Sequence, residues 1–204
     1  LAADLGQSND PTAICVMEYR KTAHVTYKGK ETPADETFDC RFLQRLPLGL
    51  SYVEQVHHIA RLMGRAPLSE RGDFVIDETG VGRPVGDLFN QAGLRPIRVT
   101  ITAGEKQSAR GANRFHVPKG TLISALDARL HTGELRFAQS LSEAGVLREE
   151  LRNFQRHISA AGRYSYDART GKHDDLVLAC ALSLWNFVGR TKPPAAVIGK
   201  YRFG

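Results

Sequence analysis

Four aspartates stand at positions where chemistry commonly gathers in a fold of strands and helices. Asp4 lies in the short segment ADLG and Asp77 ends the apolar run FVID, whereas Asp174 and Asp175 open the apolar stretch DDLVLACALSLW. In α/β sheets, functional groups collect at strand ends and helix starts. Helix capping alone would explain the acidic pair, because carboxylates in a first turn accept orphan N–H bonds and complement the helix dipole. Capping offers no reason for the two aspartates in strands.

Carboxylates gathered in a poorly hydrated site are unstable as anions, because like charges raise each other's pKa and burial raises it further. A hard divalent cation removes this problem, and oxygen ligands suit Mg²⁺ or Mn²⁺. Carboxylates from three distant parts of a chain can hold two such ions about 4 Å apart, where one activates water and the other stabilises the leaving oxygen of a phosphodiester. We therefore expect Asp4, Asp77 and Asp174 or Asp175 to be metal ligands for hydrolysis that needs no Ser or Cys nucleophile.

Basic residues predict what such a site would act on. The 204-residue chain has a formal net charge of +6 and a pI of about 9.4, which favours a polyanionic partner such as nucleic acid. Two basic groups lie in polar segments without hydrophobic period, and the second leads up to the acidic pair: Lys106, Arg110 and Arg114, then Arg163, Arg169 and Lys172. We interpret them as phosphate contacts, which bind DNA without sequence preference and with strong salt dependence.

Three further polar residues have two readings each. Lys119, in HVPKG beside a predicted helix start, either steadies a scissile phosphate or is a solvated surface lysine. His116 and His173 either assist a metal ligand or a base, or are structural histidines. Asp10 precedes Pro11 and is typical of an Asx turn that leads into a strand.

The first third of the chain reads as β-structure. Segments 12–21 and 23–30 are rich in β-branched and aromatic residues and are close enough to form a hairpin, and 36–46 is a third strand. Segment 51–64 changes to helical period, with Ser51 as its cap and Gly64 as its stop. The inward face of this helix is predicted to contain Val53, Val56, Ile59, Ala60 and Met63.

The rest of the chain alternates strands and helices. We expect strands at 73–77, 94–102 and 134–138, helices at 116–133, 142–158 and 174–189, and polar loops at 103–115 and 160–173. Between the first two strands, GVGRPVG predicts a tight turn and close packing, followed by a helix with Pro84 at its first position. An antiparallel meander followed by alternating β and α elements predicts an α/β domain with a mixed sheet.

Composition limits the class of protein. A chain of this length with 42% hydrophobic residues can form one full-sized core. Cys15, Cys40 and Cys180 are widely separated and odd in number, which indicates buried thiols in a reducing compartment rather than a disulfide framework or a zinc site. No apolar run approaches the roughly 20 residues that span a bilayer, and the sequence contains no basic-then-apolar leader with a cleavage site. We expect no membrane partner and interpret the chain as a fragment of a longer protein.

Four segments together resemble a known family. DLGQSNDPTAICV, VIDETGVGRPVGDLF, FHVPKGTLISAL and KHDDLVLACALSLW, in this order and spacing, are similar to the nuclease domain of the large terminase subunit of tailed bacteriophages. The resemblance extends from Asp4 to about Trp185. It implies an RNase H-like nuclease domain over 1–190 and a Pro-broken basic tail over 191–204, a composition typical of disorder. The family's ATPase domain should precede this chain, in which nothing resembles GxxxxGK[ST].

The resemblance also implies a function. Asp4 matches the family's first-strand aspartate, Asp77 the acidic residue that ends the next core strand, and Asp174 and Asp175 the acidic pair on the last helix. One of this pair would bind metal, and the other would cap the helix or orient a water. The protein would be an endonuclease with two Mg²⁺ or Mn²⁺ ions that cuts concatemeric double-stranded viral DNA with low sequence specificity. It would act in the cytoplasm of the infected bacterium, in an oligomeric motor with a portal protein and a small terminase subunit.

Three alternatives make different predictions. A non-catalytic basic DNA-binding module, with the acidic residues as caps and turns, would bind DNA without metal and never cleave it. An actin-like or sugar-kinase-like ATPase lobe also begins with an Asp-Leu-Gly strand and would bind ATP. A Holliday-junction resolvase would share the acidic site but prefer four-way junctions to linear duplex.

Overall fold

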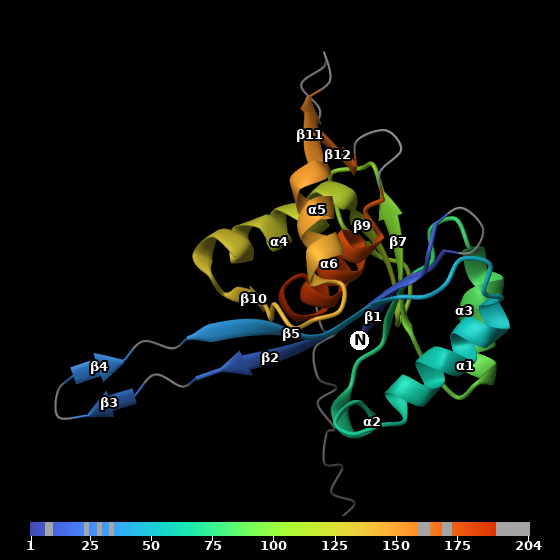
Figure 1. Ribbon diagram of the computed structural model, residues 1–204, viewed down its shortest axis with the longest axis horizontal. Coiled ribbons are helices and arrows are strands. Elements are labelled where there is room, and N and C mark those ends of the chain that lie inside the picture. The colour runs from blue at the N-terminus through green and yellow to red at the C-terminus, as the bar shows by residue number, and fades with distance from the viewer. Residues whose placement is uncertain are drawn as a thin grey trace, which may run out of the picture.

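The computed structural model describes residues 1–6, 10–22, 25–27, 30–32, 35–158, 164–168 and 173–190. Its centre is one mixed sheet of eight strands in the order β10-β5-β2-β1-β6-β7-β9-β8 (Figure 1). The strands are β1 (Ala2–Asp4), β2 (Ala13–Lys21), β5 (Glu36–Arg45), β6 (Val75–Asp77), β7 (Ile97–Thr102), β8 (Ser108–Ala109), β9 (Arg114–Pro118) and β10 (Leu135–Phe137). β1, β6, β7 and β9 run parallel, whereas β2 is antiparallel to β1 and β5. The predicted α/β class with a mixed sheet is confirmed.

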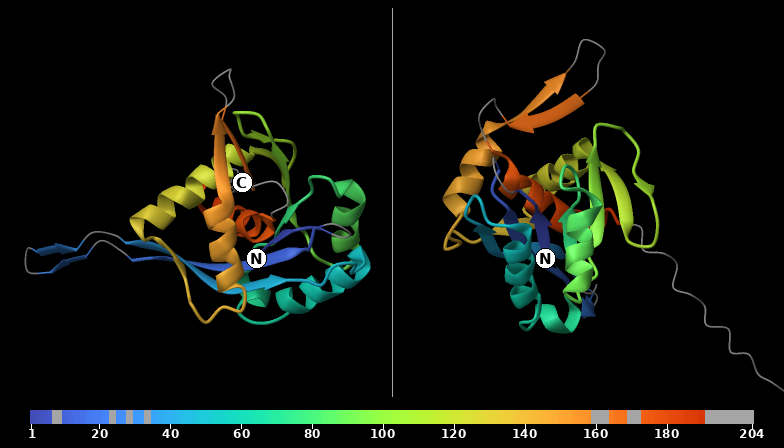
Figure 2. Two further views of the ribbon diagram at one scale, coloured as in Figure 1. Left: turned by 45° about the horizontal axis from the view of Figure 1, so that its top comes forward. Right: turned by 90° about the vertical axis from the view of Figure 1, so that its right-hand side faces the viewer.

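Helices cover both faces of this sheet (Figures 1 and 2). On one face, α4 (Lys119–Thr132), α5 (Ala144–Asn153) and α6 (Asp175–Val188) share a core with the sheet, and α6 packs across β1, β2, β5 and β6. On the other face, α1 (Tyr52–Met63) and α3 (Gly82–Gln91) form a second core, and the short α2 (Leu68–Arg71) follows α1. No helix within the described ranges is long and apolar enough to cross a bilayer.

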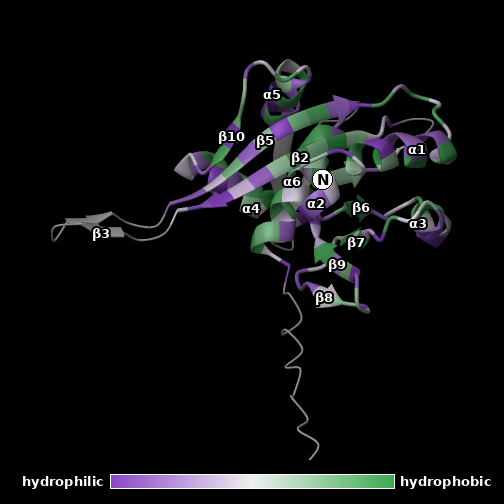
Figure 3. Cartoon of the chain, turned by 90° about the horizontal axis from the view of Figure 1, so that it is seen from below, coloured by the Kyte–Doolittle hydropathy of each residue, from purple (hydrophilic) through white to green (hydrophobic). Residues whose placement is uncertain are grey.

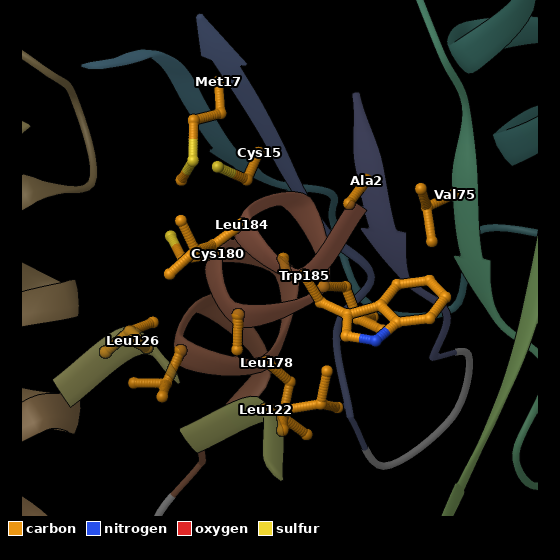
Figure 4. Packing of buried hydrophobic residues seen from close by; sticks show 14 of the residues in the cluster. Ala2, Cys15, Met17, Val75, Leu122, Leu126, Leu178, Cys180, Leu184 and Trp185 are labelled. Carbon is orange, nitrogen blue, oxygen red and sulfur yellow. The ribbon is translucent and has the colours of Figure 1, made fainter. Parts of the chain in front are cut away.

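The strands supply the two cores by alternation. Ala2 and Val75 face the α6 side, whereas their successors Ala3 and Ile76 face α1 and α3, because successive side chains of a strand point to opposite faces. α6 is buried around most of its circumference, as its apolar sequence predicts. Figure 4 shows Cys180, Leu184 and Trp185 of this helix among core side chains from the sheet and α4. All three cysteines are buried free thiols, as expected.

The predicted hairpin between 12–21 and 23–30 is wrong. β2 instead pairs with β5 along its whole length, with an irregularity between Val16 and Met17, and β3 (Val25–Tyr27) pairs with β4 (Lys30–Thr32) in a separate ribbon. Segment 36–45 pairs with β2 in place of segment 23–30 because this pairing buries Phe38, Cys40 and Leu43 in the core. β2 and β5 extend beyond the body of the protein, where their ends are hydrophilic (Figure 3).

The first helix is predicted well. The Ser51 side chain accepts the Glu54 N–H while the Glu54 carboxylate accepts the Ser51 N–H, a capping box, and Gly64 follows the last turn. Val56 and Met63 are buried as expected, but Val53 is 51% exposed. Val53 lies in the first turn, where the apolar face has only begun to meet the sheet.

Two other predictions need correction. The helix expected over 142–158 ends at Asn153, and β11 (Phe154–Ile158) pairs with β12 (Tyr164–Ala168) in what was expected to be a loop. The alternating aromatic residues of YSYDA favour a strand. Segment 103–115, expected as a loop, contains β8 and the start of β9. Backbone pairing at a sheet edge requires no apolar pattern, which is why β8 has no signal in the sequence.

Close packing at GVGRPVG is confirmed at Gly86. A Cβ atom there would lie 2.5 Å from Cζ of Arg98, so any larger residue would require the buried Arg98 side chain to shift. Pro84, expected at the first helical position, is the third residue of α3. The first turn still tolerates it, because its backbone nitrogen has no partner within the helix. The tail predicted over 191–204 lies outside the described residues.

Candidate metal centre

The topology brings the strand-end aspartates together. β1 and β6 are neighbouring parallel strands, and the pairing of Ala3 with Ile76 places Asp4 beside Asp77 at their carboxyl ends. The chain leaves β1 toward β2 and leaves β6 toward β7, on opposite sides. In α/β proteins, ligands commonly bind beyond the carboxyl ends of strands whose connections diverge in this way.

The start of α6 completes the acidic cluster. Burial raises the pKa of Asp4 well above its usual range, and the negative charges of Asp77, Asp175 and Asp174 raise it further, against a smaller opposing effect of Lys119. All four predicted aspartates therefore share one electrostatic environment. Carboxylates from β1, β6 and α6, far apart in the sequence, meet at one edge of the sheet.

Asp77 is held rigidly. Its side chain is buried, and its Oδ1 accepts the Thr79 N–H at 2.8 Å, while the Thr79 hydroxyl oxygen accepts the Ile101 N–H at 2.7 Å. Arg98, behind this loop, donates to Glu78 at 3.2 Å. Burial raises the pKa of Asp77 to about 6, although the hydrogen bond from Thr79 opposes this rise. The loop after β6 therefore fixes an acidic side chain that is difficult to ionise without a cation.

Asp174 does not cap α6. It occupies the residue before the helix but makes no side-chain capping hydrogen bond. Its Oδ2 instead accepts a hydrogen bond from Lys119 Nζ at 2.9 Å. Lys119 is the first residue of α4 and follows Pro118 at the end of β9. The structure thus places Lys119 in the acidic cluster.

Asp175 lies deeper than Asp174. It is 5% exposed, and its Oδ2 lies 3.2 Å from Arg45 Nη2 and 3.7 Å from His173 Nδ1. Burial raises the pKa of Asp175 to about 6, while the positive charge of Arg45 and then that of His173 oppose the rise. This carboxylate is also not the cap of α6. The Val177 N–H, in the first turn, is bonded by Glu150 from α5.

Asp10 joins the site unexpectedly. His173 Nδ1 lies 3.2 Å from Asp10 Oδ1, and Asp10, His173 and Asp175 each offer a ligand atom within 4.8 Å of the others. The sequence predicts only an Asx turn at Asp10 and does not predict its place beside His173 and Asp175. Asp10 and His173 are exposed and Asp175 is buried, so the group faces solvent on one side.

A buried network closes the loop that carries Asp10. Gln55 of α1 donates to the Gly6 carbonyl at 2.8 Å and accepts from the Thr12 hydroxyl at 2.7 Å. A Cβ at Gly6 would lie 2.0 Å from the Asp10 carbonyl oxygen, so glycine is required where the loop closes on itself. The glycine in DLG therefore lets Asp10 return toward Asp175.

Two charged residues next to the cluster were not predicted. Glu150 of α5 is 5% exposed, and its burial raises its pKa to about 7, against the opposing charge of Arg45. Its position between Leu147 and Leu151 on the inward face of the predicted helix is the signal that could have identified it. Arg45 at the end of β5 carries no such signal, because edge and end positions of strands often hold basic residues.

Other predicted residues lie elsewhere or outside the description. His116 lies on β9, and no hydrogen bond or ion pair joins it to the four aspartates within the described ranges. Lys106 and Arg110 are exposed beside β8, and Arg114 opens β9, where its carbonyl accepts the Arg110 N–H at 2.7 Å. The remaining predicted DNA contacts are outside the described residues: Arg163, Arg169 and Lys172.

Comparison with known proteins gives matches by structure alone. No family model and no curated protein sequence matches the chain. The large terminase nuclease from thermophilic phage G20c is 18% identical with a TM-score of 0.58, covering 91% of this chain and 79% of that one. The Thermus phage P74-26 large terminase nuclease domain is 18% identical with a TM-score of 0.57, covering 93% and 79%. The large terminase from another thermophilic bacteriophage is 11% identical with a TM-score of 0.60, covering 91% and 38%.

The G20c nuclease also matches in structures with bound magnesium, cobalt and zinc, at TM-scores of 0.57, 0.57 and 0.54. The TM-scores of these matches are evidence for the fold, and identities of 11% to 20% restrict the comparison to the fold. The mixed sheet of eight strands with helices on both of its faces is consistent with these matches. This chain therefore has the RNase H-like fold of large terminase nuclease domains.

Proposed function

We propose that this chain is the nuclease domain of a phage large terminase subunit and a divalent-metal-dependent endodeoxyribonuclease. The observation that carries the proposal is the convergence of Asp4, Asp77, Asp174 and Asp175 at the edge of an RNase H-like sheet. The bound magnesium named for the G20c nuclease supports the same chemistry on the same fold.

The donor set fits Mg²⁺ or Mn²⁺. It is rich in carboxylate oxygens, and burial, the largest cause of the raised pKa values of Asp4, Asp77 and Asp175, leaves anions that need a compensating positive charge. A hard divalent cation supplies that charge, and in phosphodiester hydrolysis it activates water and stabilises the leaving oxygen. Asp4 and Asp77 would hold one ion. Asp10, His173 and Asp175, whose ligand atoms lie within 4.8 Å of one another, would hold a second.

The chain's own residues orient the substrate. Lys119 Nζ, which is paired with Asp174, would turn to the scissile phosphate when DNA enters. The Asp174 carboxylate, released from this pair, would then serve as a further metal ligand. Exposed Lys106 and Arg110 would contact phosphates farther along the duplex. Contacts of this kind read no bases, so we expect cleavage of double-stranded DNA with low sequence specificity.

The biological setting follows from the proposed identity. The substrate would be concatemeric viral DNA in the cytoplasm of the infected bacterium, cut during genome packaging. The intact subunit would work in an oligomeric motor with a portal protein and a small terminase subunit. An ATPase lobe and a non-catalytic DNA-binding module gain no support from the matched structures.

Cleavage of supercoiled plasmid tests the proposal. The wild-type chain, Asp77→Asn and the control Asp127→Asn, whose carboxyl is exposed on α4, would each be incubated with Mn²⁺, Mg²⁺ or EDTA. We expect nicking and linearisation with metal by the wild type and the control, and none with EDTA or by Asp77→Asn. A folded wild-type protein that retards DNA but never cleaves it would favour the binding module. Faster cleavage of four-way junctions than of linear duplex would favour a resolvase.

A further inference from the structure

Arg45 joins three elements next to the acidic cluster at the carboxyl ends of β1 and β6. It ends β5, and its Nη2 donates to Glu150 Oε1 of α5 and, at 3.2 Å, to Asp175 Oδ2 of α6. The side chains of Glu150 and Asp175 are 5% and 7% exposed, and that of Arg45 is 21% exposed. One guanidinium therefore holds two buried carboxylates in a fixed relation.

Glu150 makes a second contact with its other oxygen. Oε2 accepts the Val177 N–H at 3.0 Å in a buried hydrogen bond. Val177 is the third residue of α6, the position whose N–H a capping side chain normally serves. Asp174, the residue before the helix, makes no capping bond. Glu150 thus caps α6 from a different helix.

This arrangement bears on how the metal centre is built. If an aspartate capped α6, one of its carboxylate oxygens would accept a backbone N–H of the first turn. Its negative charge would then interact with the positive end of the helix dipole instead of with a metal ion. Because Glu150 supplies the cap, neither the Asp174 nor the Asp175 carboxylate is needed to accept a backbone N–H of α6. Arg45 then fixes the rotation of the Asp175 carboxyl beside Asp10 and His173.

We propose that Arg45 and Glu150 are positioning residues, which cap α6 and orient Asp175 so that both aspartates of the acidic pair serve the metal centre. The inference rests on the proposed function, and it adds the two residues that set the geometry of the ligands without touching the metal. Such supporting contacts commonly change metal affinity about 10- to 100-fold when removed.

A change in charge has to be separated from a change in position. Arg45→Met removes a positive charge near the metal centre, so electrostatics alone predicts unchanged or tighter Mn²⁺ binding. Positioning predicts weaker binding, by about 10-fold or more. Glu150→Ala and Glu150→Gln remove the same negative charge, but the glutamine keeps an acceptor for the Val177 N–H. Positioning therefore predicts that the alanine variant binds Mn²⁺ more weakly than the glutamine variant.

Titration calorimetry with Mn²⁺ measures these affinities directly. It would be run on the wild type, the three variants and Glu149→Gln, which breaks an exposed pair with Arg152 on the same helix and should bind as the wild type does. Circular dichroism would establish that each protein is folded. If Glu150→Ala does not fold, the test relies on Arg45→Met and Arg45→Lys. The lysine variant keeps a positive charge and a donor, so it should bind Mn²⁺ more tightly than Arg45→Met and more weakly than the wild type.

The outcomes separate the two proposals. Weaker binding by Arg45→Met, and by Glu150→Ala relative to Glu150→Gln, would support the positioning role. Wild-type affinity in folded Arg45→Met, or equal affinities in the two Glu150 variants, would overturn it and leave the nuclease proposal standing. A wild-type protein that binds no Mn²⁺ would overturn both.

Discussion

Lys119 Nζ lies 2.9 Å from Asp174 Oδ2, which joins the start of α4 to the residue before α6. The two elements are adjacent because both pack on the same face of the sheet. The contact removes Asp174 from the helix-capping role that its sequence position suggests. It also places one positive charge among four carboxylates.

Lys119→Ala should lower the rate of cleavage more than the affinity for DNA. The ammonium group would stabilise charge that develops on the scissile phosphate, and removing one such donor costs about 10²- to 10³-fold in kcat in well-studied enzymes. We expect a fall of at least about 10-fold in kcat on a linear duplex, with little change in Kd. Lys21→Ala, on β2 and paired with Glu36, is the control. An unchanged kcat would show that Lys119 has a structural role and does not act on the scissile phosphate.

Without metal, the protein should lose stability as pH rises. Burial raises the folded-state pKa of Asp77 from 3.8 to about 6, so the folded state binds the proton more tightly than the unfolded state does. Its contribution is fully present below about pH 4 and is lost as pH rises through about 6. Between pH 4.5 and 8 this amounts to about 2 kcal/mol, at about 1.4 kcal/mol per pKa unit.

Urea unfolding in EDTA at both pH values measures this effect. The free energy of unfolding should fall about 2 kcal/mol less in Asp77→Asn than in the wild type. Mg²⁺ should restore stability to the wild type at pH 8 by binding the folded state alone. Identical pH dependence in the two proteins would show that Asp77 is not desolvated as described.

Asp10→Asn should remove one of two metal positions. Asp10 lies with His173 and Asp175 in one group of possible ligand atoms, whereas Asp77 lies beside Asp4 at the carboxyl ends of β6 and β1. We expect calorimetric Mn²⁺ stoichiometry to fall from two to one in Asp10→Asn and in His173→Ala. Two ions bound by both variants would remove these residues from the ligand set.

Exposed basic residues beside β8 should contribute to DNA affinity through phosphates alone. Removing one phosphate interaction reduces the steepness of log K against log salt by about 0.9. Fluorescence anisotropy of duplex DNA in EDTA should show this change for Lys106→Ala and for Arg110→Ala. Arg136→Ala, on β10 at the opposite edge of the sheet, should keep the wild-type slope. Equal slopes in all four proteins would move the DNA path away from β8.

The sequence is a good guide where burial is complete. The runs that form β6 and α6 are apolar because both pack inside the molecule, so the acidic residues at their ends stand out. Glycine in DLG also marks a close approach of two backbone segments, and glycine in GVGRPVG marks the close packing of the Arg98 side chain. These signals are enough to predict the fold class and to single out four aspartates as candidate ligands.

Contacts between distant elements cannot be predicted in the same way. The cap of α6 comes from Glu150, 27 residues earlier, and the arginine that holds Asp175 is 130 residues away. Local patterns contain no information on such pairs, so the position of Asp174 alone favours a capping role that the structure does not give it. The pairing of β2 with β5 escapes prediction for the same reason, because the nearer segment 23–30 has comparable β-propensity.

An anomalous-scattering map of Mn²⁺-soaked crystals would test most directly whether the acidic edge is a metal centre. We predict one peak bounded by Asp4 and Asp77 and a second beside Asp10, His173 and Asp175, about 4 Å from the first. Asp77→Asn crystals should lose the first peak. A map with no peak in contact with Asp4 or Asp77, at Mn²⁺ concentrations that support DNA cleavage, would contradict the assignment of these aspartates as ligands.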